Sequence, residues 1–131
     1  MRRRGRKGEL AVTALSRDTL LLMALEHARP GQAVQALPPD SGPQAAKTVA
    51  LFKSRDLEVV RLVLPAGRSL PAHQVAGDIT IHCLSGRLSL EFDGGASQLE
   101  AGELMFLAGG AAHAVTALSD ASALVTIALK S

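Results

Sequence analysis

The chain has 131 residues, of which 47% are hydrophobic and 20% charged, and its formal net charge is +2. This composition excludes a largely disordered protein, and the length is that of one domain with one core. The single cysteine, Cys83, excludes an intramolecular disulfide, and no apolar run reaches the roughly 18 residues that cross a membrane. We therefore expect a soluble protein of the reducing cytoplasm, with no membrane partner.

Residues 1–22 form a basic segment, with six Lys and Arg residues against Glu9 and Asp18. The segment carries +4, so the rest of the chain carries −2. A basic arm is suited to phosphate groups or an anionic membrane, but no aromatic residue interleaves the arginines as single-stranded nucleic acid binding favours. We interpret residues 1–22 as a flexible, solvated extension and expect no nucleic-acid partner.

Residues 23–46 are expected to contain the end of a short helix and a proline-rich lead-in. Ser16 is a suitable N-cap, and the stretch 20–27 lacks glycine and proline until Pro30 and Gly31 end it. Three prolines and a glycine between residues 37 and 45 then exclude a regular element there.

Residues 47–131 are expected to form one β-barrel domain. Short β-rich runs alternate with turn signals every 8 to 12 residues, which predicts a sandwich or barrel. Asp93, Gly94 and Gly95 predict a hairpin turn, and Gly86 and Gly102 mark two further corners. The expected strands are 47–53, 57–64, 78–84, 87–92, 97–100, 104–107, 113–117 and 122–129. The predicted class is therefore all-β.

Two segments of this region resemble the motifs of the cupin superfamily, the RmlC-like proteins. In Gly67 to Gly86, a glycine is followed after five residues by His73, and a glycine closes the segment. In Gly102 to His113, a glycine precedes five residues, then Ala108 at a position that is usually proline, and then Gly110 and the histidine. The resemblance covers about residues 47 to 129 and is to short, single-domain bacterial cupins. It implies a double-stranded β-helix, or jelly-roll, barrel, here with a short N-terminal helix, and a homodimer.

The resemblance also implies where a metal would bind. Metal-binding cupins carry three histidines and a glutamate at positions that correspond here to His73, Val75, Ile79 and His113. Two of the four positions, Val75 and Ile79, therefore have aliphatic side chains that cannot bind a metal. Catalytic metal sites normally use three protein ligands. We interpret the motif as degenerate: no resident cofactor is expected, and Zn, Fe, Mn or Ni would bind weakly at His73 and His113.

Strand alternation places Ile81 and Cys83 on the same inward face as Ile79, with His82 facing the other way. Cys83 lies about 13 Å along the strand from Ile79 and is expected to be a small buried hydrophobe. Arg61 interrupts an apolar strand. Pointing inward, it would bind a carboxylate or phosphate of a ligand; pointing outward, it would be surface charge. The sequence does not fix its direction, and we favour the outward one.

The sequence thus predicts a binding module rather than an enzyme, with no catalytic residues assigned. Its pocket would take a small organic ligand without a tightly bound metal and would be lined by His73, His113, Val75, Ile79, Ile81, Cys83 and Arg61. Two alternatives stay open. One is a metal-dependent oxygenase or isomerase with a two-histidine centre, and the other is a structural module that acts as a dimer.

Overall fold

The fold is described from a computed structural model, over residues 27–42, 45–73 and 75–129, with the backbone alone for 71–73. This part of the chain forms nine strands and no helix: β1 (Val49–Lys53), β2 (Leu57–Leu64), β3 (Ser69–His73), β4 (Ile79–Ser85), β5 (Arg87–Phe92), β6 (Gly95–Glu100), β7 (Leu104–Leu107), β8 (His113–Ala117) and β9 (Ala121–Ala128). No helix within those ranges is long and apolar enough to cross a membrane. The expected basic extension and nearly all of the expected helix at 20–27 lie outside the described residues.

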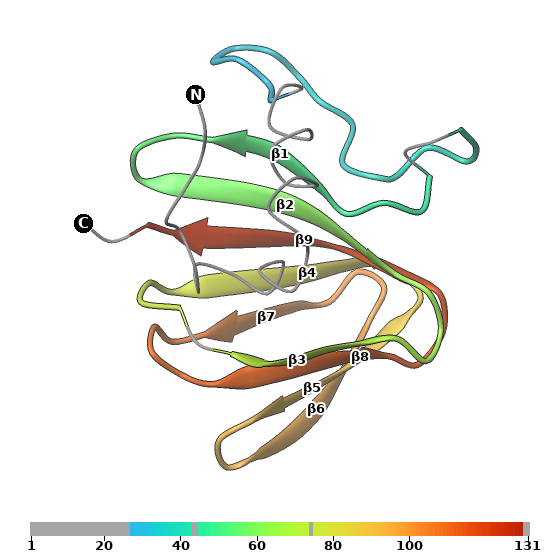
Figure 1. The fold of residues 1–131 in the computed structure, drawn as a ribbon, viewed down its shortest axis with the longest axis vertical. Coiled ribbons are helices and arrows are strands. Elements are labelled where there is room, and N and C mark those ends of the chain that lie inside the picture. Colours follow the sequence, from blue (N-terminus) through green and yellow to red (C-terminus); the bar gives the residue numbers. More distant parts are fainter. Residues whose placement is uncertain (1–26, 43–44, 74, 130–131) are drawn as a thin grey trace.

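The strands make two antiparallel sheets that face each other (Figure 1). The larger sheet has the order β1-β2-β9-β4-β7, and the smaller has the order β3-β8-β5-β6. The chain passes repeatedly between the sheets, so strands distant in sequence, such as β2 and β9, become neighbours. The expected all-β class is confirmed, and the strands of the described residues form two sheets.

All eight expected strands are present within a few residues of their predicted ends, but β3 was missed. Pro71 lies inside this strand, and proline argues against a regular strand because it cannot donate a backbone hydrogen bond. β3 is the edge strand of the smaller sheet, where one side of the backbone needs no partner strand. An edge position therefore tolerates the proline that hid this strand in the sequence.

The turns follow the glycine signals. Asp93 and Gly94 form a two-residue connection between the paired residues Phe92 and Gly95, and Gly94 has a φ of 92°. Gly86 joins β4 to β5 with a φ of 73°, and a Cβ there would overlap the backbone carbonyl oxygen of Asp120. This corner requires glycine both for its backbone angle and for its close packing.

The core between the sheets is aliphatic, as the composition predicts. It includes Val60, Leu62 and Leu64 of β2, each at most 8% exposed. A smaller cluster of Val49, Leu51 and Val59 lies on the outer face of the larger sheet. Residues 27–42 run outside β1 and are attached to it by a hydrogen bond from Ala28 N to Leu51 O (Figure 1). β2 is therefore buried on both faces.

Candidate functional site

Two loops meet at one end of the barrel, next to the motif histidine of β8. Gly110 N donates to Val75 O over 2.8 Å, and Gly109 N donates to the Asp78 carboxylate over 2.8 Å. A Cβ on Gly109 would overlap the carbonyl oxygen of Ala76, so this close approach requires glycine. The loop that precedes β4 and the loop that precedes β8 are thereby held against each other.

His113 is the first residue of β8 and is only 2% exposed. Alternate residues of a strand point to the same face, so His113 points to the same side of β8 as Val115 and Ala117. Both of these belong to the core, and the ring of His113 therefore faces the interior. Its Nδ1 lies 3.2 Å from the carbonyl oxygen of Ala111. When Nδ1 carries the proton it donates to that oxygen, and in the neutral ring the lone pair is then on Nε2.

The β-ladder places the two motif histidines side by side in the backbone. His73 is the cross-strand partner of His113, and Phe92 is the partner on the other side. Phe92 is partly buried against the core. The site end of the smaller sheet therefore combines His113, an aromatic ring and the backbone position of His73.

The other two motif positions are hydrocarbon and closely packed. Val75 is 5% exposed and Ile79 is 2% exposed, and both belong to the main core cluster. Ile81 belongs to the same cluster. Groups of this kind provide no lone pair for a metal, so the residues at these positions do not fit the donor set of metal-binding cupins.

Cys83 lies in the core towards the opposite end of β4 and has no exposed surface. Its Sγ donates to Ser85 O over 3.4 Å and is 3.6 Å from Gly86 O. Burial raises the pKa of the thiol, and the charges of Glu103 and Glu100 act in the same direction. A protonated thiol bound to backbone carbonyls suits a packing role rather than a metal ligand.

Arg61 lies on the outer face of the larger sheet, in alternation with the core residues Val60 and Leu62. It is nevertheless only 5% exposed, so it is not an ordinary surface charge. Its Nη1 donates to Gln35 O over 3.0 Å and to Leu37 O over 3.4 Å, and burial lowers its pKa. Arg61 therefore attaches the segment 27–42 to the sheet and does not line the interior.

The sequence interpretation missed one buried ionisable residue, Glu58 of β2. It is 1% exposed and has the parity of Val60 and Leu62, so its carboxylate faces the interior. Alternation puts Glu58 on the same face of β2 as those two residues, but the sequence does not show which face of this doubly buried strand is the interior.

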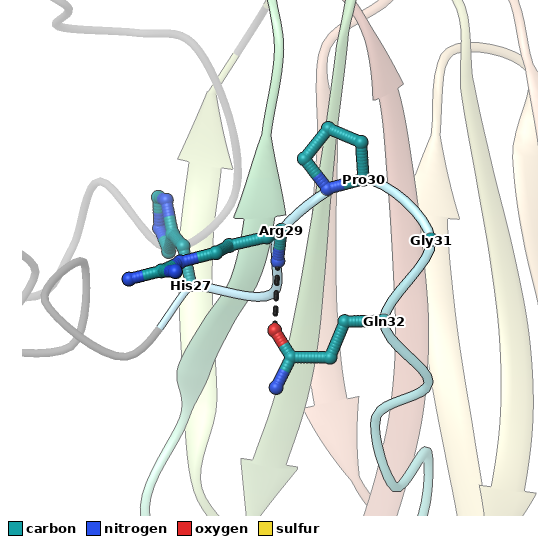
Figure 2. A pocket seen from close by; sticks show the side chains of 5 residues that line it. All are labelled: His27, Arg29, Pro30, Gly31 and Gln32. Atoms are coloured by element: carbon teal, nitrogen blue, oxygen red, sulfur yellow. Dashed lines mark hydrogen bonds between the residues drawn. The ribbon is translucent and has the colours of Figure 1, made fainter.

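Within the part of the chain that the structure describes, no three His, Cys, Asp or Glu side chains gather as a metal site would need. A pocket of about 590 Å³ lies elsewhere, lined by His27, Arg29, Pro30, Gly31 and Gln32 (Figure 2). Two of these lining residues are joined by a hydrogen bond of 2.9 Å from Arg29 N to Gln32 Oε1. None of the residues expected to line the ligand pocket contributes to it.

Comparison with known proteins decides the family. A model of the Cupin domain matches residues 60–129, which is more than half of the chain. The chain belongs to the cupin family. The matched region of this cupin contains both glycine and histidine motifs and every strand from the middle of β2 to β9. No protein with a curated description matches it.

Solved structures of similar fold include cupins of several bacteria. A cupin superfamily protein of Desulfitobacterium hafniense is 15% identical, with a TM-score of 0.67 over 80% of this chain and 96% of that one. A conserved protein of unknown function from Streptococcus pyogenes is 21% identical, with a TM-score of 0.62 over 65% and 75%. An RmlC-like cupin of Desulfovibrio desulfuricans is 27% identical, with a TM-score of 0.58 over 63% and 80%. These similarities extend to the fold and not to a reaction.

Proposed function

We propose that this cupin binds a small organic molecule at the end of the barrel that contains His113, without a tightly bound metal and without catalysing a reaction. The observation that carries the proposal is the burial of Val75 and Ile79 in the core, at 5% and 2% exposure, where metal-binding relatives have donors. A cation at this end would lack two of its four ligands.

The composition of the interior supports an organic ligand. Small-molecule sites are mostly apolar, with a few polar groups that fix orientation. At this end of the barrel, Val75, Ile79 and Phe92 supply apolar surface, and His113 supplies a hydrogen-bonding group. We include His73 in the site because it is the backbone neighbour of His113.

Protein purified without chelator is analysed for metals, and its small molecules are extracted and identified by mass spectrometry. We expect an organic molecule that is lost in His113→Ala and His73→Ala and retained in His82→Ala, a control on the outer face of β4. A stoichiometric transition metal that is lost in His73→Ala would overturn the proposal and support the two-histidine enzyme.

One further observation favours a second role, as a homodimer. Leu104 and Phe106 of β7 are 65% and 63% exposed on the outer face, where their cross-strand partners are His82 and Thr80. β7 is an edge strand, and none of its four residues is proline or charged. Edge strands normally carry such residues to prevent association, so we propose that a second copy of the chain covers this face.

Light scattering tests the dimer. We expect a dimer at micromolar concentration that Phe106→Ser converts to a monomer, while Leu118→Ser, at a residue that is 43% exposed elsewhere, has no effect. A monomeric wild-type protein would rule out this second role.

A further inference from the structure

Four strands lie at the edges of the two sheets: β1 and β7 in the larger sheet, and β3 and β6 in the smaller. An edge strand has backbone N–H and C=O groups without a neighbouring strand, and native proteins protect such edges with proline, with charged residues or with a covering segment. Three of the four edges have such protection. The fourth, β7, shows none of these features in the described part of the chain, so it can accept another strand.

Both edges of the smaller sheet are protected by their own residues. Pro71 lies inside β3, and proline has no backbone N–H to offer a further strand. Glu100 gives β6 a charge, and Gln98 in the same strand is polar and exposed. A second strand is therefore disfavoured at both of these edges.

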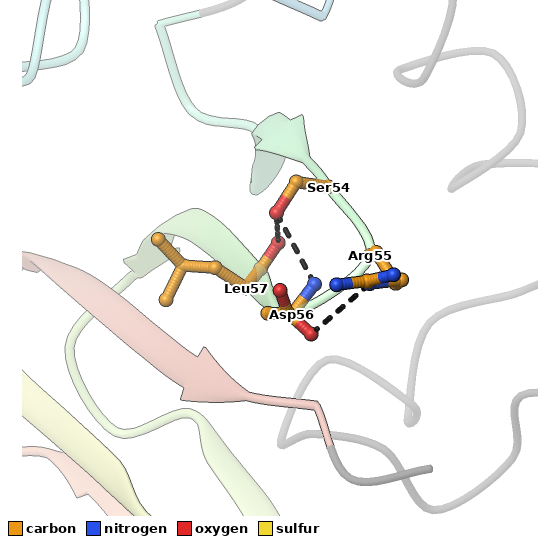
Figure 3. A network of polar contacts seen from close by, with 4 residues as sticks. All are labelled: Ser54, Arg55, Asp56 and Leu57. Atoms are coloured by element: carbon orange, nitrogen blue, oxygen red, sulfur yellow. Dashed lines mark hydrogen bonds and ion pairs between the residues drawn. The ribbon is translucent and has the colours of Figure 1, made fainter.

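The β1 edge of the larger sheet is covered by the chain itself. Leu51 O accepts a hydrogen bond of 2.8 Å from Ala28 N, and residues 27–42 run outside the strand (Figure 1). The hairpin that follows β1 has a charged tip, where Arg55 Nε and Asp56 Oδ1 form an exposed ion pair of 3.5 Å (Figure 3). Another strand is therefore blocked from β1 by a covering segment and disfavoured by the charges at its end.

The hydrogen bonds to β4 determine which backbone groups of β7 point outward. Cys83 N donates over 2.9 Å to the carbonyl oxygen of Glu103, the residue just before β7. In an antiparallel ladder, hydrogen-bonded pairs alternate with non-hydrogen-bonded pairs, so Met105 is the next residue to bond to β4. The backbone N–H and C=O groups of Leu104 and Phe106 therefore point away from β4, to the free edge.

A second β7 strand fits this edge in antiparallel orientation. A two-fold axis between the Met105 residues of two chains pairs Leu104 of each chain with Phe106 of the other, which forms four backbone hydrogen bonds. The two side chains, 65% and 63% exposed on the outer face, become cross-strand neighbours, and apolar pairs of this kind stabilise a sheet. In the same register Glu103 lies opposite Leu107, so like charges do not meet.

The comparison of the edges also identifies the partner. Pairing β7 with a different edge of a second molecule would require β1, β3 or β6 to accept a strand, and all three are protected. Pairing β7 with β7 uses the unprotected edge of each molecule and closes on itself, as two-fold contacts do. Building on the proposed dimer, we propose that two copies of this chain join β7 to β7 in antiparallel orientation, which makes one continuous sheet from the two larger sheets.

The alternative dimer packs the two outer faces on each other and shares no backbone hydrogen bond. Phe106→Ser would weaken both forms, because its side chain lies in both interfaces. The two forms differ in the backbone of β7. Edge pairing gives the N–H groups of Leu104 and Phe106 acceptors on the other chain, whereas face packing leaves them without a protein acceptor.

Hydrogen exchange followed by NMR distinguishes these two dimers. We expect the Leu104 amide to exchange at least about tenfold more slowly in the wild-type dimer than in the Phe106→Ser monomer, because only the dimer provides its acceptor. The amide of Met105, which points to β4, is the internal control. It should be protected in both proteins.

Proline at the free edge provides a second test. Leu104→Pro removes an outward N–H and should give a monomer by light scattering, whereas Leu104→Val keeps the N–H and should stay dimeric. Gln98→Pro, at the free edge of β6, is the matched control and should also stay dimeric. Arg87 O accepts from Leu118 N on the β8 side, and alternation gives Ser89 the same direction. Gln98 is paired with Ser89, so its N–H likewise points to a free edge.

A wild-type dimer in which the Leu104 amide exchanges as fast as in the monomer would overturn the inference, and so would a dimeric Leu104→Pro variant. In either case the proposed dimer stands without edge pairing. A monomeric wild-type protein would overturn both. Should Leu104→Pro fail to fold, the exchange of wild-type protein decides alone.

Discussion

The two ends of the barrel bury polar groups of different kinds. At the end near Gly86, the buried groups are the thiol of Cys83 and the hydroxyl of Ser122. Cys83 donates to Ser85 O, and the Ser122 hydroxyl is 2.7 Å from the hydroxyl of Ser85, which is exposed. At the other end, the groups are the ionisable side chains of Glu58 and His113. Neutral groups that bond to their immediate neighbours are sufficient to close a barrel. The proposed ligand site lies at the end whose buried side chains can carry charge.

The largest effect on stability is expected at the end of the barrel near Gly86, which we call the closed end. Gly86→Ala should destabilise the protein by more than about 3 kcal/mol, because it combines a positive φ with backbone overlap at Asp120. Gly94→Ala is the matched control, since Gly94 also has a positive φ but no atom lies within 4 Å of an added Cβ. The control should lose only about 1 kcal/mol. Urea unfolding measures the free energy of unfolding of both variants. Equal losses would contradict the close approach of Gly86 to the backbone of Asp120.

Next in size is the contrast between His113→Ala and Ser122→Ala. The first should reduce ligand affinity at least about tenfold, because it removes a buried polar contact at the site. The second should lose about 1 kcal/mol of stability with no change in binding, because its hydroxyl bonds to Ser85, away from the proposed site. Ligand binding that depends on Ser122 would reverse the assignment of the two ends.

The buried thiol of Cys83, at the closed end, predicts that the stability of the protein depends on pH. Burial raises the pKa of Cys83, so the folded state holds the proton more tightly than the unfolded state does. Its contribution to stability is complete below the ordinary thiol pKa of about 8.5 and is lost as the pH rises towards the folded value, by no more than about 1.4 kcal/mol per pH unit. Urea midpoints between pH 7 and pH 10 should fall more steeply for wild type than for Cys83→Ala. Parallel slopes would contradict this.

The smallest effect on binding is expected for Arg61→Met. The change removes the hydrogen bonds to Gln35 and Leu37 but also removes a desolvated charge, so stability should change by about 1 kcal/mol or less. Ligand affinity should stay within about twofold, because Arg61 faces away from the interior. Hydrogen exchange should increase at residues 35–37. A large loss of binding would place Arg61 in the site.

Much of the fold was predictable because glycine turns and alternating strands are local signals. Gly86, Gly94 and Gly102 all mark turns with positive φ, whereas β3 was missed because Pro71 is acceptable only at an edge that tertiary structure creates. Strand β8 of the smaller sheet has only one face in the core, so its buried and less buried residues alternate from His113 onward. The inward direction of His113 is therefore a local signal as well.

The site was less predictable for a physical reason. β2 is buried on both faces, because residues 27–42 cover its outer side, and such a strand reads as an apolar run without alternation. The directions of Glu58 and Arg61 were therefore ambiguous, and only the packed structure separates them. The family motif directed attention to Val75 and Ile79 and away from a carboxylate on another strand.

The most direct test of the account compares the metal content of wild-type protein with that of the Val75→His, Ile79→Glu double variant, both after dialysis against manganese and zinc. The account predicts a stoichiometric metal in the double variant, where the two missing donors are restored, and far less than one metal per chain in wild type. Stoichiometric metal in the wild-type protein would contradict it.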